Sequence, residues 1–218
     1  TNEDINHNLS FILLKKKNFK EGWIRYESRW EIKGRTKPFI TSKPEWVPKT
    51  KGAVLLWPEQ GLGDIILFSS LIPELVKKVD QLIVQTDKRL IPLFKRSFDK
   101  NIIYIDKNDF LAEEVYDYQI PIGSLPKILR PTNESFKEVP QKLLKADEAK
   151  TQIYRRKLIA NNHKKIVGIS WTTMNKLYNK SAINLDELLS EIYSPDLCFV
   201  NLQYGDVQEE IYNAKLKH

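Results

Sequence analysis

The sequence has few of the residues that build a disulfide framework or a metal centre. Its 218 residues include one cysteine, Cys198, and three histidines that are scattered along the chain. A single cysteine excludes an internal disulfide, and the histidine spacing puts no two of them on one helix face or in one loop. We therefore expect no structural metal. The cysteine lies in an apolar run, which is typical of a small buried side chain in a reducing compartment.

Long apolar runs are also lacking. Runs such as Ile65–Phe68 are broken by Ser, Pro and Lys well before the roughly 18 residues that a membrane-spanning helix needs. The chain begins at Thr1 and its single methionine is Met174, so it shows neither a start residue nor a signal peptide. The sequence predicts a fragment of a soluble, cytoplasmic protein without a transmembrane segment.

Positive charge is not gathered in the way that nucleic-acid binding requires. The formal net charge is +7 at pH 7, with most of the excess near the N-terminus. A nucleic-acid surface places basic residues on one element with stacking aromatic residues between them. Here Lys15–Lys17 is the clearest cluster, and a solvated helix end explains it. We expect no nucleic-acid partner.

The first part of the chain predicts two short helices between Asp4 and Trp30. A pair that small cannot bury its own apolar face, so it looks like the end of a helical array. The pattern Leu-Leu-x₄-Phe-x-Glu-Gly-Trp-x-x-Tyr-Glu, which starts at Leu13, resembles a terminal tetratricopeptide unit and implies a protein partner for this region. The stretch that follows, up to Gly52, contains three prolines and predicts a linker on the surface.

Short apolar runs then alternate with amphipathic segments, which predicts right-handed βαβ crossovers and a parallel sheet. Strands are expected at Ala53–Trp57, Leu82–Gln85, Ile102–Ile105 and Tyr118–Pro121, and helices at Gly63–Val79, Lys88–Phe98 and Leu125–Leu129. After a helix at Asp147–Asn161 the order restarts, with a strand at Ile166–Ser170, a helix at Leu185–Tyr193 and a strand at Phe199–Gln203. The sequence thus predicts an α/β protein with one complete Rossmann-like domain and the start of a second.

These expectations divide the chain into five parts. They are a helical hairpin at residues 1–33, a linker at 34–51, a Rossmann-like domain at 52–146, a bridging helix at 147–163 and an incomplete second domain at 164–218.

The turn between the first strand and the first helix of the α/β region carries the strongest chemical signal, Glu59-Gln60-Gly61-Leu62-Gly63-Asp64. Its glycines let the backbone approach a ligand, and free N–H groups at a helix start favour an anion or a polar oxygen. In an open parallel sheet this edge is where ligands bind. Asp64 fits two compatible roles, a helix cap and a general base that accepts a proton from a sugar hydroxyl.

A rival interpretation is a dinucleotide-binding fingerprint. Gly61 and Gly63 follow a strand, and Asp87 follows the next strand, where it could hold a ribose. The third glycine position is Ile66, which weakens this interpretation. An NAD(P)-linked oxidoreductase would need Asp87 close to the glycine turn.

Two segments of the chain resemble a known family. Residues 52–73, with Gly-Ala-Val-Leu-Leu-Trp-Pro-Glu-Gln-Gly-Leu-Gly-Asp, look like the N-terminal domain of bacterial heptosyltransferase-like glycosyltransferases that are fused to tetratricopeptide repeats. Residues 166–206, with Val-Gly-Ile-Ser-Trp, Lys-Ser and Val-Asn-Leu-Gln-Tyr-Gly-Asp, look like the start of their C-terminal domain. The resemblance implies a GT-B fold, in which two Rossmann-like domains face a cleft. The acceptor binds mainly to the first domain and the nucleotide sugar mainly to the second.

The same resemblance implies roles for individual residues. Asp64 is the candidate catalytic base, and the acceptor-side loop comprises Glu59, Gln60, Gly61 and Gly63. The candidate donor-binding residues are Trp171, Asn175, Lys180, Ser181, Gln203 and Gly205. Trp171, at the end of its strand, could line the cleft or instead pack between domains. Chemistry supports Lys180 independently, because without a metal the charge that develops on a diphosphate leaving group needs a cation and backbone N–H donors.

The sequence therefore predicts an inverting, metal-independent hexosyl- or heptosyltransferase-like enzyme. It would move a sugar from a nucleotide-diphosphate sugar to a hydroxyl of a glycan, a lipid-linked or a protein acceptor, with no further cofactor. Later strands of the second domain are absent, so we expect this fragment to be inactive alone. The alternatives are a repeat-linked interaction protein whose glycosyltransferase-like domain has lost catalysis, and the oxidoreductase described above.

Overall fold

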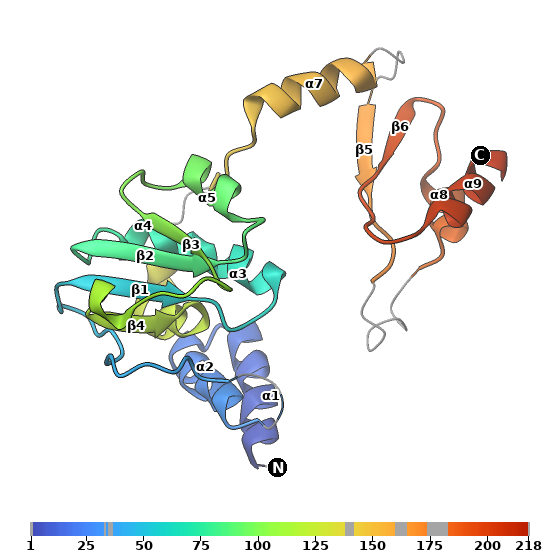
Figure 1. Ribbon diagram of the computed structural model, residues 1–218. Coiled ribbons are helices and arrows are strands. Elements are labelled where there is room, and N and C mark those ends of the chain that lie inside the picture. The colour runs from blue at the N-terminus through green and yellow to red at the C-terminus, as the bar shows by residue number, and fades with distance from the viewer. Residues whose placement is uncertain are drawn as a thin grey trace. The chain divides into compact units, whose positions relative to one another are not determined.

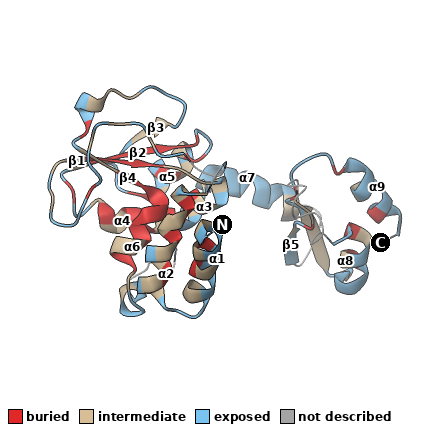
Figure 2. Cartoon of the chain, turned by 90° about the horizontal axis from the view of Figure 1, so that it is seen from below, coloured by how far each residue is buried: buried red, intermediate tan, exposed pale blue. Residues whose placement is uncertain are grey.

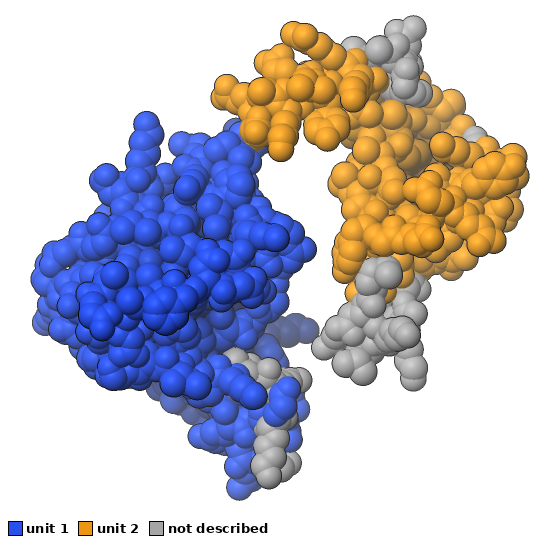
Figure 3. Space-filling view, in the orientation of Figure 1, with its two compact units in different colours: residues 1–146 blue, residues 147–218 orange. Residues whose placement is uncertain are grey.

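The computed structural model describes residues 2–32, 34, 37–137, 142–159, 165–173 and 183–217. The chain divides into two compact units, Thr1–Ala146 and Asp147–His218, which Figure 3 shows in different colours. Each unit has its own parallel sheet and its own hydrophobic core.

The first unit begins with two helices and continues as an α/β domain (Figure 1). Its elements are α1 (Asn2–Lys15), α2 (Phe19–Tyr26), η1 (Glu27–Trp30), β1 (Ala53–Trp57), α3 (Leu62–Phe68), η2 (Ser69–Leu71), α4 (Ile72–Leu75), β2 (Gln81–Thr86), α5 (Ile91–Ser97), β3 (Ile103–Asp106), η3 (Glu113–Val115), β4 (Tyr118–Pro121), η4 (Ile122–Ser124), α6 (Leu125–Leu129) and η5 (Glu134–Phe136), where η marks a 3₁₀ turn.

The strands of the first unit form one four-stranded parallel sheet in the order β3-β2-β1-β4, and the predicted parallel sheet is confirmed. Leu55 of β1 lies opposite Ile83 of β2 on one side and opposite Gln119 of β4 on the other. This is the order of the first four strands of a Rossmann-type sheet. The strand order reverses between β1 and β4, and open α/β sheets bind ligands outside the carboxyl ends of the strands at such a reversal.

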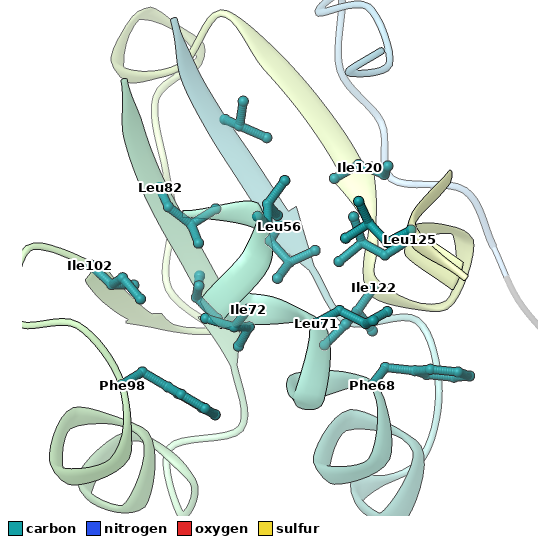
Figure 4. Close-up of a cluster of buried hydrophobic side chains, with 14 of the residues drawn as sticks. Leu56, Phe68, Leu71, Ile72, Leu82, Phe98, Ile102, Ile120, Ile122 and Leu125 are labelled. Atoms are coloured by element: carbon teal, nitrogen blue, oxygen red, sulfur yellow. The ribbon is translucent and has the colours of Figure 1, made fainter. Parts of the chain in front are cut away.

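Both faces of β1 are buried because its side chains alternate between two apolar layers. Val54 and Leu56 point into the larger core, which also takes side chains from α3, α4, α5 and α6. Figure 4 shows Leu56 with neighbouring residues of this core from the adjacent strands and the helices. Leu55 and Trp57 point to the other face, where the Trp30 ring lies 5.7 Å from the Trp57 ring. Burial on both faces is typical of a central parallel strand.

The helix predicted at Gly63–Val79 is interrupted and appears as α3, η2 and α4. The hydroxyls of Ser69 and Ser70 each donate to the backbone carbonyl three residues earlier, which favours a tighter turn. Pro73 follows in the first turn of α4, where the missing N–H does no harm. The predicted helix 88–98 also starts later than expected, with Pro92 in the first turn of α5.

The segment expected to be a surface linker contributes to both the sheet and the core. Trp46 is 0% exposed and belongs to the larger core. Its backbone N–H donates to the carbonyl of Gln119 at 2.8 Å, and Glu45 forms a parallel bridge with the same residue. The segment thus lies along the outer edge of β4 and covers backbone groups that an edge strand would expose.

The helix pair α1 and α2 is packed into the first unit. The indole N–H of Trp23 donates to the carbonyl of Arg130 at 2.9 Å, and Tyr26 is buried in the larger core. The two helices approach closely at Gly22, where a Cβ would come within 2.7 Å of the Leu14 side chain. The apolar face that the pair cannot bury alone is therefore covered by the α/β part.

The second unit is smaller. It contains α7 (Glu148–Ile159), β5 (Lys165–Ile169), α8 (Leu185–Ile192), β6 (Leu197–Asn201) and α9 (Gln208–Lys217). β5 and β6 pair in parallel, with Val167 opposite Phe199, in a sheet separate from the first, as predicted. β6 ends earlier than the expected Gln203, because the side chain of Asn201 accepts from the backbone N–H of Gln203 at 2.7 Å and turns the chain.

Burial differs between the units. Figure 2 shows buried residues concentrated around the first sheet and α4, whereas α7 and α9 are mostly exposed. The buried apolar residues of the second unit are Trp171, Leu185, Leu189, Val207 and Ala214. Throughout the described ranges, each helix is too short or too polar to span a bilayer.

Candidate functional site

The loops that follow β1 and β4 meet where the strand order reverses. Pro58–Gly61 follows β1 and η4 follows β4, and both leave the same edge because the strands are parallel. The backbone N–H of Gly123 donates to Glu59 Oε1 at 3.0 Å and joins the two loops. A Cβ at residue 123 would collide with Glu59 Oε1, so any larger residue here would displace this buried carboxylate.

Arg29 lies in η1, the 3₁₀ turn that directly follows α2 of the helix pair, and its side chain fills the space between these loops. Its side chain is 2% exposed, and Nη2 donates to Glu59 Oε1 at 3.1 Å and to Ser124 Oγ at 2.7 Å. The guanidinium carbon lies 4.8 Å from the ring centroid of Tyr26 and 4.4 Å from that of Trp30. The place that the fold offers to a ligand is thus partly occupied by a side chain of the protein.

A second carboxylate balances the charge of Arg29. Glu27 Oε1 accepts from Arg29 Nη1 at 2.5 Å, and Glu27 Oε2 accepts from Lys127 Nζ at 3.0 Å. The hydroxyl of Ser124 donates to Glu27 as well. Burial opposes ionisation of Glu27, but Arg29 and Lys127 outweigh it and hold the pKa of this carboxyl below its ordinary value.

Glu59 has the opposite balance. Its side chain is 0% exposed, and burial raises its pKa above the ordinary value although Arg29 and the N–H of Gly123 act against the rise. Its second oxygen, Oε2, has no hydrogen-bond partner in the part of the chain that the structure describes. The charge of Glu59 therefore costs free energy, and Arg29 is the cation that offsets this cost.

Glu59 and Gln60, which the family resemblance assigns to an acceptor-side loop, both turn inward. Gln60 Nε2 donates to the hydroxyl of Tyr26 on α2. With the contact between Glu59 and Arg29, this bond ties the two residues before Gly61 to the helix pair. Both side chains therefore hold the turn in place.

Gly61, Gly63 and Asp64 lie on the outer side of the same turn. α3 begins at Leu62 with Gly61 as its N-cap, so Asp64 is not the cap that the sequence suggests and lies instead in the first turn. A Cβ at Gly63 would meet no atom within 4 Å, and one at Gly61 would lie 3.5 Å from Asp64 Oδ2, an ordinary contact. The Asp64 carboxylate is half-buried and forms no hydrogen bond or ion pair with the described residues.

In the second unit, Gln203 joins the ends of both strands. Its Oε1 accepts from Ser170 Oγ at 2.9 Å and from the backbone N–H groups of Trp171 and Thr172, each at 3.1 Å. Its Nε2 donates to the carbonyl of Tyr204 at 2.9 Å. Gln203 is buried, so its amide shapes the loop that leaves β5.

The other expected donor-binding residues divide into two groups. Trp171 donates its indole N–H to Glu210 at 2.7 Å and packs in the small core, and Gly205 has a φ of +97°, a conformation that favours glycine. Both therefore have structural roles. Asn175, Lys180 and Ser181 lie outside the described residues.

Asp87, on which the oxidoreductase interpretation depends, is engaged by cations. Its carboxylate accepts from Arg89 at 2.8 Å and 2.9 Å, and Lys107 Nζ lies 3.5 Å away. The hydrogen bonds from Arg89 hold the pKa of Asp87 well below its usual range. Both oxygens are held by the protein, which counts against a role in ribose binding.

Sequence reasoning missed the part that the helix pair plays at this edge. Arg29 and Ser124 are remote in the chain from Glu59 and belong to no recognised motif. One signal could have identified Arg29, because it stands between Tyr26 and Trp30, and an arginine in an aromatic segment needs a partner if it is buried. Across the described ranges, no group of three or more His, Cys, Asp or Glu side chains is placed to hold a metal ion.

Comparison with known proteins shows a distant similarity to one curated protein. No family model and no solved structure matches the chain. The chain is similar to the protein FlbA of Caulobacter vibrioides, with 29% identity over 232 aligned positions. The alignment covers 94% of this chain and 37% of FlbA, so the chain spans little more than a third of that relative. The name FlbA states no activity.

Proposed function

We propose that the chain is part of a glycosyltransferase that moves a sugar from a nucleotide-diphosphate sugar to a hydroxyl group, with inversion and without a metal. In this proposal the first unit binds the acceptor and the second contributes to donor binding, as in a GT-B fold. The parallel sheet with its Rossmann strand order supports the proposal, and so does the resemblance of residues 52–73 and 166–206 to heptosyltransferase-like enzymes.

The observation that carries the proposal is the turn at Gly61–Asp64. It lies at the reversal of the strand order, where open α/β sheets bind ligands. Glycine within a helix costs about 1 kcal/mol relative to alanine, yet Gly63 lies in the first turn of α3 with open space where its Cβ would be. A ligand that approaches the backbone here explains the glycine and brings a sugar hydroxyl next to Asp64.

Asp64 acts in this proposal as the general base. Its carboxylate accepts the proton of the acceptor hydroxyl while the hydroxyl oxygen attacks the anomeric carbon of the donor sugar. The bond from that carbon to the diphosphate breaks, and the nucleoside diphosphate leaves with the electron pair. Attack opposite the leaving group inverts the anomeric carbon, and Lys180 supplies positive charge to the departing phosphate.

The test is the substitution Asp64→Asn in the full-length protein. Asparagine keeps the shape of the side chain but cannot take a proton, so sugar transfer should fall about 10²- to 10⁴-fold while nucleotide affinity stays nearly unchanged. Turnover and nucleotide affinity are measured on the same preparation. Transfer at the unmutated rate would show that Asp64 is not the base.

Two further variants serve as a control for Asp64→Asn and as a test of donor binding. Asp109→Asn makes the same chemical change at an exposed loop position of the same unit and should leave transfer unchanged. Lys180→Ala should weaken the affinity for the nucleotide sugar, because a charge-assisted contact to phosphate is lost. Equal losses in Asp64→Asn and Asp109→Asn would point to a general effect on the protein.

The surface of the helix pair favours a second candidate, a protein-interaction module. Ile5, Phe11 and Ile12 of α1 are 64%, 51% and 53% exposed. Apolar residues exposed together on one element are typical of a surface that binds another protein or a neighbouring repeat. A full-length protein that binds no nucleoside diphosphate would favour this candidate over glycosyl transfer.

A further inference from the structure

We propose that Arg29 is a positioning residue for the turn Gly61–Asp64, and that the segment comprising the helix pair and η1 therefore contributes to the function of the α/β domain. The guanidinium of Arg29 holds Glu59 and Ser124, and through Glu59 it fixes the start of the turn that carries Gly61, Gly63 and Asp64. The kinetic consequence rests on the function proposed above. The structural coupling between Arg29 and the turn does not.

The contacts run in one continuous path. Arg29 Nη2 lies 3.1 Å from Glu59 Oε1, and the same oxygen accepts the N–H of Gly123 at 3.0 Å. Arg29 Nη2 also donates to Ser124 Oγ at 2.7 Å. One guanidinium nitrogen and one carboxylate oxygen therefore fix the loop after β1 against the loop after β4. Gly61 follows Glu59 by two residues.

Glu59 and Arg29 each depend on the other for their position. The Glu59 side chain is fully buried and its Oε2 has no described partner, so beyond the N–H groups that it accepts, Arg29 is the cation that the described residues bring to it. Arg29 is held between the rings of Tyr26 and Trp30, which fixes the direction of its side chain. A buried ion pair gives little net stability compared with apolar packing, so its value here lies in the geometry that it imposes.

A second bond supports the same conclusion from another residue. Gln60, which directly precedes Gly61, donates to the hydroxyl of Tyr26. Both residues that lead into the glycine turn are thus held by the helix pair, and Asp64 follows within one helical turn. A misplacement of about 1 Å at a reacting group can lower a rate about 10²-fold, so loss of these contacts should reach catalysis.

The experiment compares Arg29→Gln, Arg29→Lys and Ser124→Ala with a matched control, Arg25→Gln. Arg25 lies on the same helix pair, and among the described residues its side chain bonds to Asn6 and Glu21 of that pair, so its loss leaves the turn unchanged. Hydrogen exchange of the peptide 58–66 and of β2 is measured with kcat and KM in the full-length protein. We expect Arg29→Gln to speed exchange in 58–66 about tenfold or more and to lower kcat about 10- to 100-fold. KM for the nucleotide sugar should change less than about twofold, because the donor binds elsewhere.

The remaining variants make the test decisive. Arg29→Lys keeps the charge but not the fork of donors and should recover part of both effects, and Ser124→Ala should show a smaller change in the same direction. These two variants decide the question if Arg29→Gln does not fold. Unchanged exchange in 58–66, or exchange there no faster than the global unfolding rate that the β2 amides measure in the same variant, would overturn the positioning role. A loss of melting temperature with normal kcat would overturn it as well. If the unmutated protein transfers no sugar, the proposed function fails, while the exchange data still decide the coupling.

Discussion

Glu59 in the first unit and Gln203 in the second occupy corresponding places, just beyond the carboxyl ends of paired parallel strands. Each is buried, and each accepts backbone N–H groups from the loop that follows the neighbouring strand. Glu59 accepts the N–H of Gly123, and Gln203 accepts those of Trp171 and Thr172. Both side chains therefore hold two loops together at the edge where α/β proteins bind ligands.

The two side chains differ in charge, and the difference decides how far each edge depends on the rest of the chain. Gln203 is neutral, and its hydrogen-bond partners among the described residues all lie in its own unit, close to the two strands. Glu59 is ionisable and buried, so it needs a cation, which comes from the helix pair. A neutral amide makes a local anchor, whereas a buried carboxylate couples the edge to a distant segment.

The sheets around these anchors also differ. β1 is the central strand of a sheet covered on both faces, whereas β5 has exposed positions such as Ile166, which is 45% exposed. An isolated two-stranded sheet is marginally stable in water. The second edge therefore has less support from a buried sheet than the first.

The largest expected effect comes from removing the cation. Arg29→Gln should lower the free energy of unfolding of the first unit by about 3–5 kcal/mol, because Glu59 remains buried without its partner. Chemical denaturation followed by tryptophan fluorescence measures this. Arg25→Gln is the control and should cost less than about 1 kcal/mol. Equal losses of unfolding free energy in the two variants would contradict the view that Glu59 depends on a cation from a distant segment.

Gln203→Leu should have an intermediate effect. Leucine has a similar size but cannot accept the N–H groups of Trp171 and Thr172, and unsatisfied buried donors cost about 1–3 kcal/mol. Exchange should quicken in residues 170–173 and stay normal in 58–66. A change in the peptide 58–66 would contradict the view that this anchor is local.

Substitutions of Gly63 and Gly123 in the first unit should have smaller effects on stability. Gly63→Ala should stabilise the protein by about 0.5–1 kcal/mol, since the backbone is helical and the added methyl group meets open space. The same variant should lower sugar transfer by obstructing the ligand. Gly123→Ala is the matched substitution at a crowded position and should destabilise. A Gly63→Ala variant with full transfer would remove the functional reason for that glycine.

Glu59→Gln should change the free energy of unfolding least at acidic pH. Whether the variant gains or loses stability as pH rises tells whether the ion pair with Arg29 is net unfavourable or net favourable. The pKa of Glu59 is raised from 4.5 in the folded protein, so its ionisation lowers stability as pH rises through that range. The variant should match the unmutated protein below about pH 4.5, gain relative stability as pH rises toward the folded pKa, and keep a constant advantage above it. Denaturation midpoints across this range measure the difference. A variant that loses stability with rising pH would show that the pair with Arg29 is net favourable.

The strand segments and their parallel pairing were predicted from the sequence, whereas the order of the strands in the sheet came from the structure. Runs such as Ala53–Trp57 are continuous and apolar, and helices lie between β1 and β2 and between β2 and β3, so local pattern and chain connectivity suffice for the parallel pairing of these strands. Helix bounds were less accurate. Whether Ser69, Ser70 and Pro73 interrupt a helix depends on competing local hydrogen bonds that the apolar pattern does not register.

The turn Glu59–Asp64 could also be located from the sequence, because a strand end, two glycines and a helix start are local features. The direction of each side chain in that turn could not. Glu59 and Gln60 point inward only because Arg29 and Tyr26 of the helix pair dock against them, and these contacts join residues about 30 positions apart in the chain. Burial and pairing of charges depend on which segments meet in space. The tertiary structure alone therefore separates the residues that hold the turn from Asp64, which forms no hydrogen bond or ion pair with the described residues.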